Sequence, residues 1–219
     1  MASFPQVTVC KHSAIPHLLT PIRDVTTSSV QFAYYASRLM ALLAEEAMAM
    51  LPAQQVSITT PTGATLPDAV RINTSKVCAV SIIRAGDSLL EAVRKIAPDV
   101  HVGKILIQRD ESSADKHPVM YYHKFPLGIA RMPVILCDPM LATGGSVIMA
   151  VNTLLDAGCR AESIIFANVI AAPEGIEAVS SAHPAVRIVT CVIDASLNDN
   201  KYIMPGLGDF GDRFYGTEV

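Results

Sequence analysis

The chain has 219 residues, of which 51% are hydrophobic and 17% are charged, and its formal net charge is −3. A chain of this length and hydrophobic content is expected to bury a substantial core, which argues against intrinsic disorder. The lack of a basic excess argues against nucleic-acid binding, so any site for a phosphate group must be local.

Residues 1–25 contain Pro5, Pro16 and Pro21 and predict an irregular N-terminal arm. This segment has no long apolar stretch behind a basic flank, so we expect no secretory signal. A helix is predicted next, over residues 28–50, because a serine N-cap precedes apolar residues at helical spacing. Charged residues interrupt this helix, which argues against a membrane span. Its many alanine and methionine residues favour a place in the core or in a subunit interface.

Short apolar strands and helices alternate in the rest of the chain. The predicted strands are 77–83, 103–108, 133–137, 163–170 and 186–193, and the predicted helices are 88–96, 147–157 and 173–182. This alternation is typical of the α/β fold class, in which helices cover both faces of a mainly parallel sheet. Ligands of such sheets bind beyond the carboxyl ends of the strands. No repeat, low-complexity tract or linker follows residue 28, so we expect one domain over residues 1–219.

A long polar insert, residues 109–131, interrupts the alternation where a short strand-to-helix connection is expected. It begins at Arg109, directly after a predicted strand, and is rich in charged residues. Such an insert predicts either a lid that closes over a ligand or a solvated surface hairpin. The pair Tyr121-Tyr122 suits a β-ribbon.

The most informative motif is the turn CDPMLATGGSV, Cys137 to Val147, between a predicted strand and a predicted helix. Its small residues place several backbone N–H groups, two hydroxyl groups and a helix N-terminus around one point, which suits a phosphate. Asp138 would repel a phosphate alone, but it can accept hydrogen bonds from a ribose phosphate. A Walker loop requires a lysine after its glycines, and Ser146 stands there instead. An ordinary structural turn is the alternative.

A second candidate is the turn Ile83 to Asp87, which follows the first of the predicted strands. Arg84 in this turn presents a fork of donors that matches a phosphate, and its small neighbours expose further backbone amides. An ordinary surface arginine explains the pattern equally well.

The C-terminal segment Tyr202 to Asp212 is rich in glycine and matches two unrelated motifs by chance. Its Gly-x-Gly-x-x-Gly lacks the strand, turn and helix of a dinucleotide site, and its Asp-Phe-Gly lacks the other kinase motifs. A loop of this composition can lay its own N–H and C=O groups along the edge of a flat base. Ile203 or Phe210 would then supply an apolar face.

The cysteines are odd in number and mostly lie within apolar runs, at Cys10, Cys78, Cys137, Cys159 and Cys191. They form no C-x-x-C pair and no zinc-binding pattern with the six dispersed histidines. They therefore predict reduced core residues in a cytoplasmic protein.

Together these segments resemble the uracil phosphoribosyltransferase family from about residue 19 to residue 219. The motifs that carry the resemblance are DPMLATGGS at 138–146 and YIMPGLGDFGDRFYGT at 202–217, with support from AAPEGI at 171–176 and IIRAG at 82–86. The resemblance implies transfer of phosphoribosyl from 5-phospho-α-D-ribose 1-diphosphate (PRPP) to uracil, giving uridine monophosphate (UMP) and diphosphate in pyrimidine salvage. It also implies a type I phosphoribosyltransferase fold, with a flexible β-ribbon loop at 109–131 and a small base-binding hood at 195–219.

The resemblance further implies the roles of individual residues. Arg109, Asp138 and Asp209 would be catalytic, and Arg84 and Arg109 would contact the diphosphate. The uracil site would consist of Ile203, Gly208, Asp209 and Phe210. The PRPP site would consist of Arg84, Arg109, Asp138, Pro139, Met140, Leu141, Ala142, Thr143, Gly144, Gly145, Ser146 and Asp209.

Departures from the family pattern shape the remaining expectations. Pro139 stands where many type I members have a second acidic residue, so Mg²⁺ is expected to be held mainly by PRPP and water, without a protein ligand. Phe210 is typical of the eukaryotic-like members, and Asp87 departs from many members. We expect no nucleic acid or membrane partner, a homodimer or homotetramer, and GTP as an effector. The alternatives are a transferase for another base and a catalytically silent regulator that senses PRPP or UMP.

Overall fold

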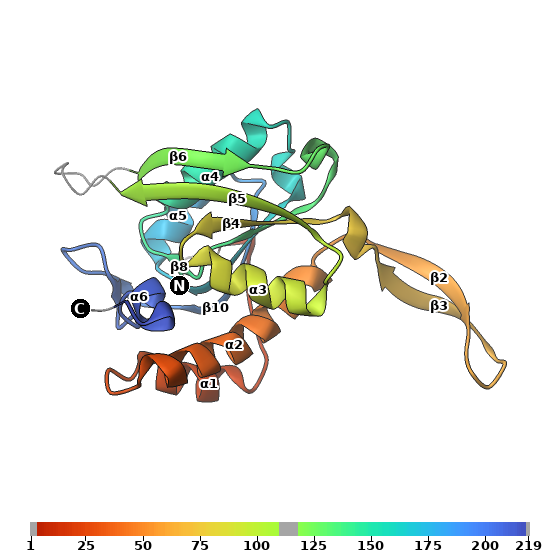
Figure 1. Cartoon of the computed structure of the whole chain (residues 1–219), viewed down its shortest axis with the longest axis horizontal. Helices are drawn as coiled ribbons and strands as arrows, with labels where there is room; N and C mark the ends of the chain where they lie inside the picture. The colour runs from red at the N-terminus through yellow and green to blue at the C-terminus, as the bar shows by residue number, and fades with distance from the viewer. Residues whose placement is uncertain (1–3, 110–117, 218–219) are drawn as a thin grey trace.

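The computed structural model describes residues 4–109 and 118–217, and its centre is a mainly parallel sheet (Figure 1). The strands are β1 (Val7–Val9), β4 (Cys78–Ile83), β5 (His101–Arg109), β6 (Pro118–Lys124), β7 (Val134–Cys137), β8 (Met140–Leu141), β9 (Ile164–Ala171) and β10 (Arg187–Ile193). Their order is β1-β10-β9-β7-β4-β5-β6, and β8 pairs with β9. β6 is antiparallel to β5, whereas the other pairs of this sheet are parallel. The predicted fold class is confirmed.

Helices cover the sheet in two layers that divide the core (Figure 1). The first layer contains α1 (Ile15–Arg23), α2 (Ser29–Ala49) and α3 (Gly86–Ile96), and the second contains α4 (Gly145–Asp156) and α5 (Pro173–Ala182). On β4, Ala79 faces the first layer, whereas Val80 and Ile82 face the second, as the two-residue period of a strand requires. Strands buried on both faces are continuous apolar runs in the sequence, which is why their positions were predicted correctly.

The N-terminal arm is not irregular, so that prediction is wrong. β1 extends the edge of the sheet by pairing with β10, and α1 packs into the core. The buried face of α1 has the spacing of a helix and consists of Ile15, Leu18, Leu19 and Ile22. Pro16 stands in the first turn, where a helix needs no N–H donor, and Pro21 lies inside the helix. The apolar spacing indicates α1, but Pro16 and Pro21 argue against a helix when the sequence is considered alone.

Residues 53–72 form a β-hairpin that was not predicted. Its strands, β2 (Ala53–Thr59) and β3 (Thr65–Ile72), pair antiparallel and project away from the main sheet (Figure 1). Most of their residues are exposed, so the sequence lacks the apolar alternation that marks a half-buried strand.

The polar insert contains β6, in which Tyr122 lies opposite Leu106 of β5, and this confirms the predicted β-ribbon. Part of the insert, residues 110–117, lies outside the described residues. The other elements within the described residues are three short 3-10 helices (Thr74–Lys76, Ile129–Arg131 and Ala161–Ser163) and the C-terminal β11 (Ser196–Leu197), β12 (Ile203–Met204) and α6 (Phe210–Tyr215). Over residues 4–109 and 118–217, no helix has both the length and the apolar character that crossing a membrane requires.

Candidate active site

The turn that follows β7 surrounds a hollow of about 120 Å³, lined by Asp138, Met140 and residues 141–147. Gly144 is the N-cap of α4 and has a φ of 85°, in the left-handed region that favours glycine. The first turn of α4 therefore borders the hollow, with its unpaired N–H groups and the positive end of the helix dipole. This arrangement suits a phosphate, as the sequence predicted.

The turn is held in place by β9 and α5. Pro139 is buried, and its carbonyl accepts hydrogen bonds from the backbone N–H groups of Val169 and Ile170. Gly175 of α5 approaches the turn so closely that an added Cβ would lie 2.3 Å from the carbonyl oxygen of Ala142. Pro139, which was predicted as a PRPP-binding residue, thus anchors the turn to the sheet, whereas its neighbours line the hollow.

A larger cavity of about 300 Å³ adjoins the hollow and shares Asp138, Met140 and Ala142 with it. Its other lining residues, most of them from the C-terminal segment, are Ala85, Asn200, Lys201, Tyr202, Ile203, Gly208, Asp209, Phe210 and Gly211. All four residues predicted to bind uracil are among them. Because three residues border both spaces, one ligand can place a phosphate in the hollow and a ribose at the mouth of the cavity.

Asp209 and Phe210 are held by the C-terminal helix and by the core. Asp209 is the N-cap of α6, and its Oδ1 accepts a hydrogen bond of 2.9 Å from the backbone N–H of Asp212. The ring of Phe210 is buried, with its centroid 5.2 Å from that of Phe32 and 5.7 Å from that of Phe214. The bulk of Phe210 is therefore accommodated by the core.

Arg84, directly after β4, is bound by the C-terminal segment. Its guanidinium donates to Oδ1 of Asp212 at 2.6 Å and to Oγ1 of Thr217 at 2.8 Å. The hydroxyl of Thr217 and then the guanidinium of Arg84 hold the pKa of Asp212 below its ordinary value. A Cβ added to Gly211 would lie 3.2 Å from Arg84 Nη2 and 3.3 Å from Asp209 Oδ1. Arg84 and Asp209 thus converge on Gly211, which lines the cavity.

The backbone of Arg109 lies at the end of β5, where Arg109 is paired with Pro118 of β6. A Cβ added to Gly145, in the wall of the hollow, would lie 3.5 Å from the ring of Pro118. The β-ribbon therefore reaches the rim of the phosphate hollow at the level of Arg109. The side chain of Arg109 lies outside what the structure describes.

An ion pair explains Asp87, which departs from the pattern of many family members. Asp87 Oδ1 accepts a hydrogen bond of 2.6 Å from Ser81 Oγ and contacts Lys104 Nζ of β5. The three residues come from β4, β5 and the first turn of α3. The charge of Asp87 is thus matched locally, by a lysine that lies opposite Ser81 in the neighbouring strand.

The turn between β11 and β12 contributes three lining residues that were not predicted to bind a substrate, namely Asn200, Lys201 and Tyr202. The Oδ1 of Asn198 closes this turn by accepting a hydrogen bond of 2.9 Å from the N–H of Tyr202. Lys201 has a φ of 65°. The Asn-Asp-Asn-Lys sequence does indicate a turn, but only the fold places that turn over the cavity.

Known proteins resemble this chain over nearly its whole length. A family model described as uracil phosphoribosyltransferase matches residues 9–217. The uracil phosphoribosyltransferase of Dictyostelium discoideum is 44% identical over 218 residues, which cover 99% of each chain. Uracil phosphoribosyltransferase 1 of Schizosaccharomyces pombe is 47% identical over 202 residues, which cover 92% of this chain and 90% of the relative. A solved structure of a protein from Aquifex aeolicus superimposes with a TM-score of 0.85 at 30% identity, over 97% of this chain and 99% of that one.

Proposed function

Because the chain belongs to the uracil phosphoribosyltransferase family, we propose that the hollow and the cavity beyond β7 hold the two substrates of that reaction. The enzyme transfers the phosphoribosyl group of PRPP to uracil and releases diphosphate, giving UMP, and it has the type I phosphoribosyltransferase fold. One observation supports the placement of the substrates above all: Asp138, Met140 and Ala142 border both spaces. A donor with its 5-phosphate in the hollow therefore presents its ribose to a base in the cavity.

The chemistry of the transfer matches the groups around these spaces. The bond from C1 of the ribose to the diphosphate breaks, N1 of uracil bonds to C1, and the N1 proton passes to water. Positive charge develops on the ribose and negative charge on the diphosphate, so the site must hold the reactants in line and stabilise the leaving group. We propose that Arg84 and Arg109 stabilise the diphosphate. The amides of residues 143–146 bind the 5-phosphate, and Asp138 accepts hydrogen bonds from ribose hydroxyls.

Selection of uracil requires a donor for O4 and an acceptor for N3–H. We propose that the backbone of Ile203 and of residues 208–210 provides both, because these residues line the cavity. Cytosine reverses the pattern at both atoms and would leave buried polar groups unpaired, which is strongly unfavourable. The β-ribbon would close over the donor and exclude water, which otherwise hydrolyses it.

We propose that Mg²⁺ enters the site with PRPP. The donor supplies phosphate and hydroxyl oxygens, which Mg²⁺ prefers, so the ion would need few or no protein ligands. Within the described residues, no group of three or more His, Cys, Asp or Glu side chains could hold a metal ion. When bound, the ion would neutralise charge on the diphosphate.

A steady-state assay with PRPP, Mg²⁺ and a panel of bases tests the proposed placement and its alternatives. We expect UMP and diphosphate from uracil and little product from cytosine or purines. A purine preference would favour a transferase for another base. Binding of PRPP or UMP without release of diphosphate would favour a silent regulator.

Asp209→Asn should lower kcat/KM by about 10²-fold, comparable to the loss of one catalytic electrostatic contact, whereas Asp212→Asn should change it by no more than about threefold. Asn is as good an N-cap as Asp, so α6 should persist in the first variant and the loss should come from charge in the cavity. Asp212 pairs with Arg84, and the side chains of Arg84 and Asp212 are 50% and 35% exposed. Exposed ion pairs contribute little. Measuring both variants with PRPP and uracil checks this, and equal losses would mean that Asp212 has the role assigned to Asp209.

Assembly, GTP control and cellular location are further proposals. Val30 and Tyr34 leave apolar surface exposed on α2, at 82% and 59%, and this supports a homodimer or homotetramer. The cysteines are free and buried, which supports a cytoplasmic location. Light scattering of the purified protein and the assay repeated with GTP would test assembly and control.

A further inference from the structure

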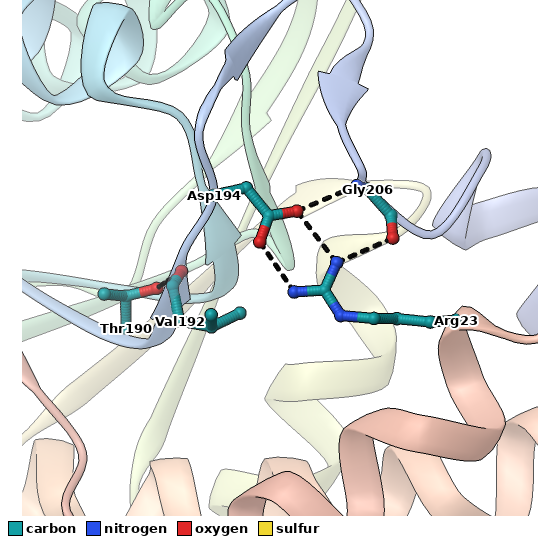
Figure 2. Close-up of polar contacts among 5 residues, drawn as sticks. All are labelled: Arg23, Thr190, Val192, Asp194 and Gly206. Carbon is teal, nitrogen blue, oxygen red and sulfur yellow. Dashed lines mark hydrogen bonds and ion pairs between the residues drawn. The ribbon is translucent and has the colours of Figure 1, made fainter.

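An ion pair between Arg23 and Asp194 binds the loop that connects Ile203 to Gly208, two residues that line the cavity. Arg23, the last residue of α1, donates to Asp194 from both of its terminal nitrogens, at 2.8 and 2.6 Å (Figure 2). Asp194 directly follows β10, and its side chain is only 4% exposed. Neither residue lines the cavity or the hollow as described above.

The pair holds both backbone groups of Gly206. Asp194 Oδ2 accepts the N–H of Gly206 at 2.8 Å, and Arg23 Nη1 donates to its carbonyl oxygen at 2.8 Å (Figure 2). Gly206 has a φ of 67°, and an added Cβ would lie 2.1 Å from the carbonyl oxygen of Ile203. Gly206 thus lies against Ile203 on one side and precedes Gly208 by two residues on the other, and both of these line the cavity.

A second arginine, Arg213, is buried and ties the same two segments together. Arg213 of α6 donates to the carbonyl oxygens of Ile22 and Asp24, at 2.6 and 2.7 Å, and of Leu207, at 2.7 Å. The end of α1 and the loop over the cavity are therefore joined by several charged hydrogen bonds, which are stronger than neutral ones.

We propose that Arg23 and Asp194 are positioning residues for the base: they hold residues 203–208 in the conformation that binds uracil, without touching either substrate. This inference rests on the proposed placement of uracil in the cavity. When a loop recognises a base through its backbone N–H and C=O groups, the affinity depends on the direction of those groups. Glycine residues restrict the backbone conformation little, so other contacts must fix that direction. The phosphate hollow is built from β7, β9, α4 and α5, so affinity for PRPP should depend little on this pair.

The test is a comparison of Michaelis constants for the two substrates. Arg23→Ala should raise the KM for uracil about 10-fold or more, because it removes a charged partner from a shielded pair and frees Gly206, while the KM for PRPP stays within about twofold. Arg23→Lys should show a smaller rise in the same direction. Lysine keeps the positive charge beside Asp194 but lacks the planar fork that reaches the carboxylate and Gly206 together.

Arg187→Ala is the matched control. Arg187 begins β10, at the end of the sheet opposite Asp194, and its Nη1 donates to the carbonyl oxygen of Met50 at 2.7 Å. Its loss should lower the melting temperature and leave both Michaelis constants unchanged. If Arg23→Ala does not fold, as judged by circular dichroism, the folded Arg23→Lys variant decides the question.

The outcomes separate the inference from the function on which it rests. Wild-type KM values for uracil in the folded Arg23 variants would overturn the positioning role, as would equal rises for uracil and PRPP. Absence of UMP formation by the wild-type protein would instead overturn the proposed function.

Discussion

Replacing Arg109 with alanine is expected to lower kcat by about 10²- to 10³-fold, the usual effect of removing one group that stabilises developing charge. The leaving diphosphate gains negative charge in the transition state. Its attraction to a neighbouring guanidinium is therefore stronger in the transition state than in the ground state. The melting temperature should stay unchanged, because Arg109 is at the end of a strand where a polar insert begins.

The fold gives this prediction a structural basis beyond the motif. Arg109 pairs with Pro118, and the ring of Pro118 would be 3.5 Å from a Cβ added to Gly145 in the wall of the phosphate hollow. The end of β5 is thus next to the place proposed for the donor. An arginine side chain is long enough to reach a diphosphate bound there.

Lys124→Ala is the control for this experiment. Lys124 is an exposed cation at the other end of β6, opposite Lys104, so the variant removes the same charge from the same ribbon far from the hollow. It should keep wild-type kcat. Arg109→Lys should fall between the two, since lysine retains the charge but not the bidentate geometry. An unchanged kcat in Arg109→Ala would remove this residue from the mechanism.

Gly175→Ala is expected to lower kcat/KM for PRPP by about 10²-fold, because a displacement of about 1 Å in a catalytic constellation has effects of this size. The new Cβ would lie 2.3 Å from the carbonyl oxygen of Ala142, a separation that real Cβ atoms do not adopt. Either α5 must therefore move, or the turn after β7 that borders the phosphate hollow (the phosphate turn) must move. In an ordinary helix this substitution would be favourable, since alanine has the higher helix propensity, so a loss would identify the contact as its cause.

Glu177→Ala provides the comparison for Gly175→Ala. Glu177 is exposed on the same helix, and its replacement leaves the contact with the phosphate turn intact. The kcat/KM for PRPP and the melting temperature of both variants should be measured together. A wild-type kcat/KM for PRPP in a folded Gly175→Ala variant would show that the turn does not depend on its distance from α5.

The strands and helices from residue 77 onward were predictable because each carries its own signal. A doubly buried strand such as β9 is an unbroken apolar run, and a helix such as α3 shows apolar spacing. α1 was not predicted because prolines usually break a helix, although one of them occupies the tolerated first turn. The β2–β3 hairpin was missed because it is exposed on most of its length and buries too little to leave a pattern.

The phosphate turn was determined by the sequence itself, because its groups are consecutive residues whose geometry follows from local backbone preferences. The sequence marks Gly144 in a left-handed conformation, the small residues around it and the start of α4, but it does not mark the contacts with β9 and α5 that hold the turn in place. The glycine content of the C-terminal segment likewise predicts, from the sequence alone, a loop that exposes its backbone.

Only the tertiary structure decided which distant groups meet. Arg23 and Asp194 are 171 positions apart, and Arg84 and Asp212 are 128 apart. A charged side chain has a similar local signature whether it is solvated or paired, so no pattern in the sequence marks these contacts. They arise because parallel strands bring their carboxyl ends to one edge of the sheet, where the C-terminal segment packs against α1 and completes the cavity.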